Sequence, residues 1–147
     1  MKRNIAGFAV WAAAYISALW MNLGSFWMGD GAAEGQLGIT ALYVVMSLLG
    51  LWLTRDNLRW IRHGFFWSVM AVLGGVFCLL ARKGVPWAVI PGLILGGALF
   101  TPFYGLTCFE ILEDWDVFYG VMLVLSAIWM VLNGGLLLRV KRTQRRG

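Results

Sequence analysis

Long apolar stretches alternate with short polar connections along the chain. Five stretches contain no charged residue: Ile5–Met28, Gly38–Thr54, Gly64–Ala81, Trp87–Phe109 and Val117–Leu138. At about 1.5 Å per residue, each stretch approaches or exceeds the roughly 30 Å that a helix needs to cross a bilayer core. Because lipid cannot satisfy exposed backbone N–H and C=O groups, these stretches are expected to be helical.

The pattern predicts a single all-α integral membrane domain, 1–147, built as a small polytopic helical bundle. Four or five of its apolar segments are expected to cross the bilayer, and the form with four crossings has one re-entrant segment. Of 147 residues, 61% are hydrophobic and only 13% are charged, whereas a soluble domain is about half apolar and a quarter charged. The lipid bilayer is therefore the first expected partner.

The charged residues fall into separate groups, and these groups predict an orientation. Bases cluster at Lys2-Arg3, at 55–62, at Arg82-Lys83 and in the C-terminal tail 139–147, while six of the seven acids lie in 30–34 and 110–116. Basic segments tend to stay in the cytoplasm, so the five-base tail places the C-terminus inside. The acidic loop 110–116 then lies outside, away from the anionic cytoplasmic leaflet.

The number of crossings depends on which segment turns back. Five crossings leave seven bases inside and five outside, whereas a re-entrant Gly64–Ala81 leaves all 12 inside. A third arrangement, in which Trp87–Phe109 does not cross, leaves ten inside and two outside. Pro91, Pro102 and several glycines suit that segment to a broken helix. Charge favours the second arrangement and hydropathy favours five crossings, so we expect four crossings and one segment that does not fully cross.

The acidic loop is the first candidate for chemistry. Glu110, Glu113 and Asp114 follow the spacing i, i+3, i+4, so they would share one face if the helix continued through them. Three like charges on one face would raise the pKa of a carboxyl group or attract a cation. The alternative is a solvated acidic cap at the end of a helical hairpin.

Polar residues within the fourth stretch form a second candidate site. Pro102 leaves a backbone carbonyl without its usual partner, and the hydroxyls of Thr101 and Tyr104 would either satisfy it or line a solute site. Asn22 and Asn133 lie in the first and fifth stretches. A buried amide in lipid needs a partner, so we expect both to bond to other helices.

Small residues suggest close helix packing. Gly92 and Gly96 form a Gly-x-x-x-Gly pattern in the fourth stretch, which allows two helix backbones to approach closely. Packing within one chain and packing between chains explain this pattern equally well.

No set of residues indicates catalysis. The sequence contains no GxSxG, HExxH or phosphate-binding loop, and Cys78 and Cys108 stand in different segments without metal spacing. His63 is placed at a membrane edge, where haem ligation is not expected. We therefore expect no enzymatic activity, no cofactor and no metal. The tail RVKRTQRRG follows an apolar span directly, which indicates a topology anchor rather than a nucleic-acid-binding segment.

Two functions follow from these observations. The first is a non-catalytic integral membrane subunit or homo-oligomer that acts through helix–helix association, alone or in a larger membrane complex. The alternative is a small transporter or channel for an ion or small solute, with its site near the fourth segment and the loop 110–116. Size and span number fit a protein of the bacterial inner (plasma) membrane with a cytoplasmic C-terminus.

Overall fold

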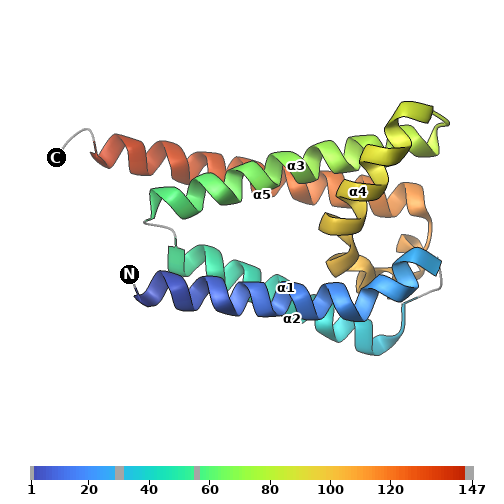
Figure 1. Cartoon of the computed structure of the whole chain (residues 1–147), viewed down its shortest axis with the longest axis horizontal. Helices are drawn as coiled ribbons and strands as arrows, with labels where there is room; N and C mark the ends of the chain where they lie inside the picture. The colour runs from blue at the N-terminus through green and yellow to red at the C-terminus, as the bar shows by residue number, and fades with distance from the viewer. Residues whose placement is uncertain (1, 29–31, 55–56, 145–147) are drawn as a thin grey trace.

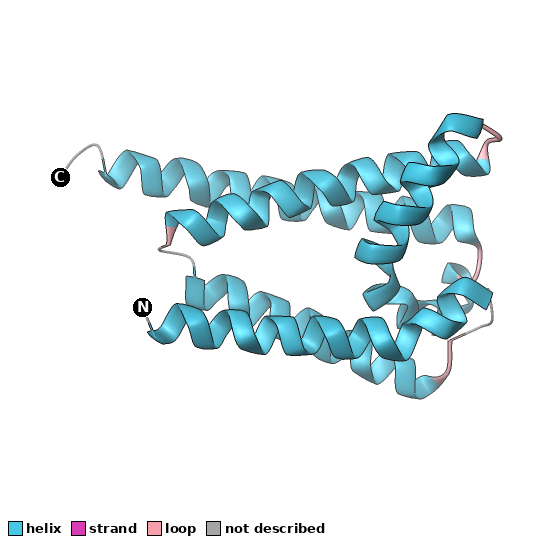
Figure 2. Cartoon of the chain, in the orientation of Figure 1, coloured by secondary structure: helices cyan, strands magenta, loops and turns pink. Residues whose placement is uncertain are grey.

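The computed structural model describes residues 2–28, 32–54 and 57–144, and almost all of these residues are helical (Figure 2). The α-helices are α1 (Lys2–Met28), α2 (Glu34–Thr54), α3 (Leu58–Arg82), α4 (Val89–Phe100) and α5 (Trp115–Gln144). Three short 3-10 helices, η1 (Pro86–Ala88), η2 (Thr101–Cys108) and η3 (Glu110–Leu112), lie before and after α4. Within the described ranges there is no β-strand, so the prediction of an all-α chain is confirmed.

Five helical segments are long and apolar enough to cross a membrane: Ile5–Met28, Gly35–Thr54, Leu58–Arg82, Pro86–Cys108 and Trp115–Arg142. They correspond to the five predicted apolar stretches, and most extend beyond them because polar residues form the helix ends. The fourth segment differs from the others because it consists of three successive helices, η1, α4 and η2.

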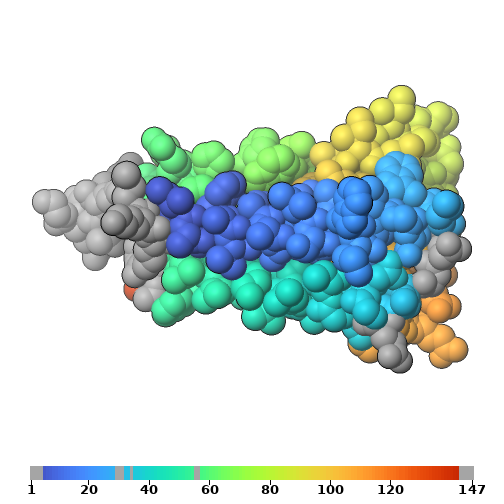
Figure 3. Space-filling model, turned by 60° about the horizontal axis from the view of Figure 1, so that its bottom comes forward, coloured from blue at the N-terminus to red at the C-terminus, as the bar shows by residue number. Residues whose placement is uncertain are grey.

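The four long helices form two antiparallel pairs, α1 with α2 and α3 with α5 (Figure 1). Figure 3 shows α1 running along the middle of one face, between α2 on one side and α3 with α4 on the other. We call the end where α1 begins and α5 ends the basic end, since Arg59, Arg62, Lys141 and Arg142 lie there. The opposite end, where η3 lies and α5 begins, is the acidic end.

The fourth segment enters and leaves at the acidic end (Figure 1). From the turn after α3, α4 runs antiparallel to α3, with Gly92 beside Cys78 and Leu95 beside Gly74. The chain then reverses, and η2 returns along α1 and α2 until Gly105 contacts Gln36 near the start of α2. Twelve α-helical residues extend only about 18 Å, so α4 alone is shorter than a bilayer core.

The segment that turns back is therefore not the one favoured by the charge count. Residues Gly64–Ala81 lie within α3, a continuous helix of 25 residues, and do not reverse. The reversal occurs in 87–109, where Pro102 lacks the N–H that would continue α4. No proline lies within α3, so its apolar run has no backbone reason to break.

The ends of α3 have local causes. Asn57 precedes the helix, and its side-chain oxygen accepts hydrogen bonds from the backbone N–H groups of Arg59 and Trp60 at 3.0 and 3.4 Å. After the helix, Gly84 adopts φ +81°, a left-handed conformation that a glycine accepts without strain. The backbone N–H of Val85 then bonds to Leu80 O at 3.1 Å, which closes the last turn.

The main core lies at the acidic end, where the fourth segment fills the space between the two pairs. It contains Phe26, Cys78, Phe100, Tyr104, Phe118 and Met122. Large apolar side chains such as Trp20 (80% exposed) and Ile90 (69% exposed) cover the outside of the bundle. An apolar outer surface above a small core is expected of a membrane-embedded protein.

Candidate functional site

The reversal at Pro102 leaves backbone carbonyls that side chains of α1 and α2 satisfy. In a continuous helix, the N–H of residue 102 would donate to the carbonyl of Ala98, but proline has no N–H. The hydroxyl of Tyr15, on α1, donates to Ala98 O instead, at 2.5 Å. A residue 83 positions away in the sequence therefore replaces the missing backbone donor.

The carbonyl of Pro102 accepts two side-chain hydrogen bonds. Asn22 Nδ2 donates to Pro102 O at 3.1 Å, and Thr40 Oγ1 donates to the same oxygen at 2.9 Å. Asn22 Nδ2 also donates to Thr40 Oγ1 at 3.1 Å, so the three groups form a closed triangle. Both side chains are fully buried. We call Tyr15, Asn22, Thr40, Thr101 and Pro102 the break cluster.

The hydrogen bonds fix the orientation of the Asn22 amide. Its nitrogen must face Pro102 O, because the reversed amide would place two acceptors against each other. The amide oxygen, Asn22 Oδ1, is then turned away from Pro102 O, and among the described residues it has no hydrogen-bond partner. The hydroxyl of Thr101, which is also fully buried, has no partner in the same part of the chain. The break cluster thus contains two buried polar atoms that no described protein group satisfies.

Close packing holds η2 in this position. A Cβ atom added to Gly105 would overlap the backbone carbonyl of Gln36 and approach Thr40 Oγ1 to 2.5 Å. Gln36 Nε2 in turn donates to Ser25 Oγ at 2.8 Å and to Met21 O at 3.1 Å. Gln36 therefore links α1 to α2 at the level where η2 packs on both.

The electrostatic environment of the cluster comes from backbone dipoles. The stretches 5–28, 35–54 and 86–108, which build the cluster, contain no charged residue. The C-terminal end of α4, at Phe100, is next to Thr101 and Pro102. The negative end of α4 and the positive start of η2 adjoin there, so their dipoles largely offset each other and leave the cluster without a net charge.

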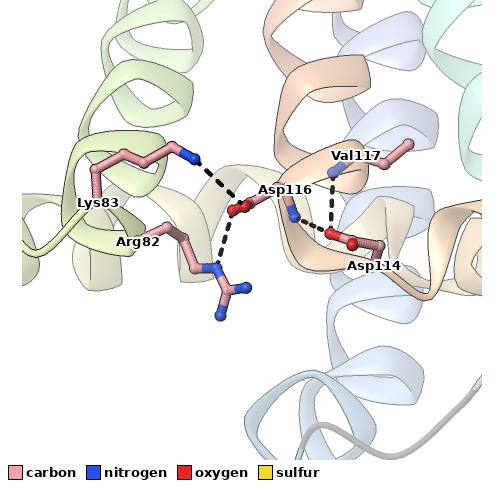
Figure 4. A network of polar contacts seen from close by, with 5 residues as sticks. All are labelled: Arg82, Lys83, Asp114, Asp116 and Val117. Atoms are coloured by element: carbon pink, nitrogen blue, oxygen red, sulfur yellow. Dashed lines mark hydrogen bonds and ion pairs between the residues drawn. The ribbon is translucent and has the colours of Figure 1, made fainter.

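The predicted acidic face does not form. Glu110 lies in η3, and the chain bends at Glu113 before α5 begins at Trp115. All three acids are exposed, and because the helix does not continue through them, the condition for a shared face is not met. Asp114 instead caps α5: its Oδ1 accepts from the backbone N–H of Asp116 at 2.7 Å and of Val117 at 3.4 Å (Figure 4). Nowhere in 2–28, 32–54 or 57–144 do three His, Cys, Asp or Glu side chains converge as a metal site requires.

The fourth carboxylate of the loop connects α5 to α3. Asp116 Oδ1 accepts from Arg82 Nε at 3.0 Å, and Lys83 Nζ lies 3.7 Å from Asp116 Oδ2 (Figure 4). About half of the Arg82 and Asp116 side chains and 72% of the Lys83 side chain are exposed, so solvent weakens the attraction. This ion pair accounts for the two bases at an end that is otherwise acidic.

The predicted binding residues of the fourth segment are separated from the acidic loop. Thr101 lies in the break cluster, and Tyr104 is buried in the main core, where its ring stacks on Trp115 with centroids 5.6 Å apart. Glu110, by contrast, is exposed at the surface. Thr101 and Tyr104 are therefore both buried inside the bundle, in different clusters, whereas the carboxylates lie at its surface.

The predicted packing glycines serve contacts within the chain. A Cβ on Gly92 would lie 3.3 Å from the backbone of Phe77 and Cys78, and one on Gly96 would lie 2.7 Å from Cys78 Sγ. Asn133 is fully buried beside Gly64 of α3, yet its Nδ2 donates to Trp129 O of its own helix at 2.8 Å. Asn22 bonds to two other elements and Asn133 bonds within α5.

Sequence reasoning did not identify Tyr15, Thr40 or Gln36. A signal was present, because Gln36 and Thr40 are one helical turn apart in an uncharged segment and so share a face. Their partners could not be assigned from spacing, since Thr40 and Pro102 are 62 positions apart.

Comparisons with models of protein families, with curated proteins and with solved structures found no match to the chain. The site is therefore interpreted from its own geometry.

Proposed function

We propose that α1, α2, α3 and α5 cross the bilayer, and that α4 and η2 re-enter from the acidic end. Of the nine bases within the described residues, this topology places seven at the basic end and only Arg82 and Lys83 at the other. The positive-inside tendency then assigns the basic end, with both ends of the chain, to the cytoplasm. An inner (plasma) membrane location is part of this proposal.

Cysteine accessibility tests the topology directly. Single cysteines at positions 62, 83, 113 and 141, in a chain whose Cys78 and Cys108 are replaced by alanine, are labelled in intact cells with a membrane-impermeant maleimide. Positions 83 and 113 should react, and positions 62 and 141 should react only after the membrane is permeabilised. Labelling of 62 and 83 from the same side would contradict a crossing by α3.

We further propose that the chain is a small transporter or channel whose solute site is the break cluster. The observation that carries this proposal is the interrupted helix with buried, unpaired Asn22 Oδ1 and Thr101 Oγ1 at its break. Interrupted helices with freed backbone groups at membrane depth are typical of the binding sites of transporters and channels. The polar groups act by binding and positioning a solute, without catalysis.

Flux through reconstituted liposomes tests this function. Purified protein should accelerate the exchange of small ions or polar solutes compared with protein-free liposomes. The variant Asn22→Leu should reduce that flux at least about tenfold, because it removes the amide from the cluster. Asn133→Leu, which changes a buried amide outside the cluster, is the matched control and should keep the flux. Equal flux with and without the protein, or equal loss in both variants, would contradict the proposal.

The second candidate is a subunit or homo-oligomer that acts through helix association, and the outer glycines favour it. Gly24, Gly38, Gly120 and Gly135 have no neighbouring atom within 4 Å of an added Cβ, so another helix could approach them closely. Gly92 and Gly96 are engaged with α3, which makes Gly38→Leu the appropriate variant. It should break a complex that survives purification in mild detergent, whereas an intact complex would count against α2 as the contact.

A further inference from the structure

We propose that the break cluster binds one partly dehydrated monovalent cation, such as Na⁺, K⁺ or NH₄⁺. This inference rests on the function proposed above, because it names the class of ligand for the same site. It requires oxygen ligands, surroundings that do not repel positive charge, and a reason to prefer one charge over two.

The first requirement is met by the unpaired atoms. Asn22 Oδ1 accepts hydrogen bonds or binds cations but cannot donate, so its partner must be a donor or a cation. Thr101 Oγ1 offers a second oxygen from the residue before Pro102, whose carbonyl already holds the Asn22 amide. Leaving such atoms unsatisfied in a fully buried position is costly, which argues for a ligand there.

The second requirement is met because the segments that build the cluster carry no positive charge. The stretches 5–28, 35–54 and 86–108 contain no Lys, Arg or His. The negative end of α4 at Phe100 and the positive start of η2 at Thr101 adjoin, so their dipoles largely offset each other. In interrupted membrane helices, freed backbone carbonyls and the C-terminal ends of half-helices coordinate Na⁺ or H⁺.

The third requirement follows from the absence of acidic residues in the surrounding sequence. The stretches 5–28, 35–54 and 86–108 contain no Asp or Glu, so no carboxylate of theirs can offset a divalent charge. Ca²⁺ sites usually include carboxylates, whereas neutral oxygens suffice for K⁺ in channel filters. Neutral ligands therefore favour a single positive charge.

Cation-dependent stability tests the inference. Purified protein in detergent is heated in choline chloride, and NaCl, KCl or NH₄Cl replaces the choline at constant ionic strength. A ligand that binds only the folded state raises Tm in a saturable manner. At least one small cation should raise Tm by several degrees relative to choline, and CaCl₂ at matched ionic strength should not reproduce the effect.

Two threonine variants test whether the rise in Tm caused by the cation arises at the break cluster. Thr101→Val keeps the side-chain shape and removes a hydroxyl that has no partner among the described residues, so it should fold normally. The cation concentration that gives half of the maximal rise in Tm should increase about tenfold, because one oxygen ligand is lost. Thr107→Val is the matched control in the same η2, because Thr107 Oγ1 donates to Tyr104 O at 2.8 Å away from the break. Its cation response should stay within about twofold of the unmodified protein.

Line broadening of the ²³Na signal by the unmodified protein provides a direct measurement that needs no variant. Equal Tm in choline and in all small cations, without line broadening, would overturn the inference and leave only water in the cluster. A response unchanged in Thr101→Val would also overturn it. Cation binding without flux would contradict the proposed transport alone, and flux of another solute without cation binding would contradict this inference alone.

Discussion

The two halves of the fourth segment are held by different forces. The α4 half packs on α3 through glycines, with Gly92 against the backbone of Phe77 and Leu95 against Gly74. Its side-chain hydrogen bonds to α3 are limited, among the described residues, to Cys78 Sγ with Gly92 O at 3.3 Å. The η2 half is held on α1 and α2 by hydrogen bonds from Asn22 and Thr40.

Whether the backbone is regular or broken determines which contacts a neighbouring helix can make with it. A regular α-helix satisfies its own N–H and C=O groups, so a neighbour can recognise it only by shape. A broken helix exposes carbonyls that polar side chains must satisfy, particularly away from water. Shape complementarity therefore dominates where the chain is regular, and polar pairing dominates where Pro102 interrupts it.

The largest effect is expected at Gly105, where η2 depends on both shape and polarity. Gly105→Ala would push a methyl group into the backbone of Gln36, which cannot move without shifting α2. We expect a loss of about 3 kcal/mol or more in the free energy of unfolding, measured by SDS titration with circular dichroism. Gly120→Ala, whose added Cβ meets no atom within 4 Å, is the control and should be neutral or slightly stabilising. Similar losses in both variants would mean that η2 is not packed this closely.

The two buried asparagines, Asn22 and Asn133, should contribute differently to the free energy of unfolding. Asn22→Leu removes hydrogen bonds to Thr40 and to Pro102 O and should cost about 2 kcal/mol. Asn133→Leu removes a bond within α5 and an oxygen without a described partner, so its cost should stay below about 1 kcal/mol. The same unfolding titration measures both, and a larger loss for Asn133→Leu would reverse our assignment.

A smaller effect is expected where α4 packs by shape. Gly92→Ala places a Cβ 3.3 Å from the α3 backbone at Phe77 and Cys78, which strains the contact by about 1–2 kcal/mol. The higher helix propensity of alanine relative to glycine offsets up to about 1 kcal/mol of this strain. Gly134→Ala meets only the Phe65 ring, at 3.4 Å, which can move aside. Thermal unfolding in detergent should rank Gly92→Ala below Gly134→Ala, and the opposite order would argue against close α3–α4 packing.

The smallest effect is expected for the ion pair at the acidic end. Arg82→Gln and Asp116→Asn should each lower Tm only slightly, because both groups are partly exposed and screened. Combining them should be no worse than the more damaging single variant, and the coupling should shrink in 1 M salt as screening increases. A large, salt-independent coupling would show that the pair is more shielded than the structure indicates.

Much of the fold was predictable because its causes are local. Freedom from charge over five long stretches identified the helical segments. Pro91 and Pro102 made the fourth stretch a candidate for a broken helix, but charge favoured Gly64–Ala81, and Pro91 lies within the continuous α4. A shared face for Glu110, Glu113 and Asp114 depended on a helix that continued through all three, and spacing alone could not show whether it did. The chain bends at Glu113, so Asp114 became a cap and Asp116 an ion-pair partner.

The sequence by itself determined five apolar helical segments and the grouping of charges, since hydropathy acts over neighbouring residues. Only the tertiary structure decided that the fourth segment reverses, and that Tyr15, Asn22 and Thr40 satisfy its freed carbonyls. These partners lie 62 to 83 positions from the groups that they bind. Which side chains meet across such separations depends on how whole helices pack, and spacing along the chain does not encode it.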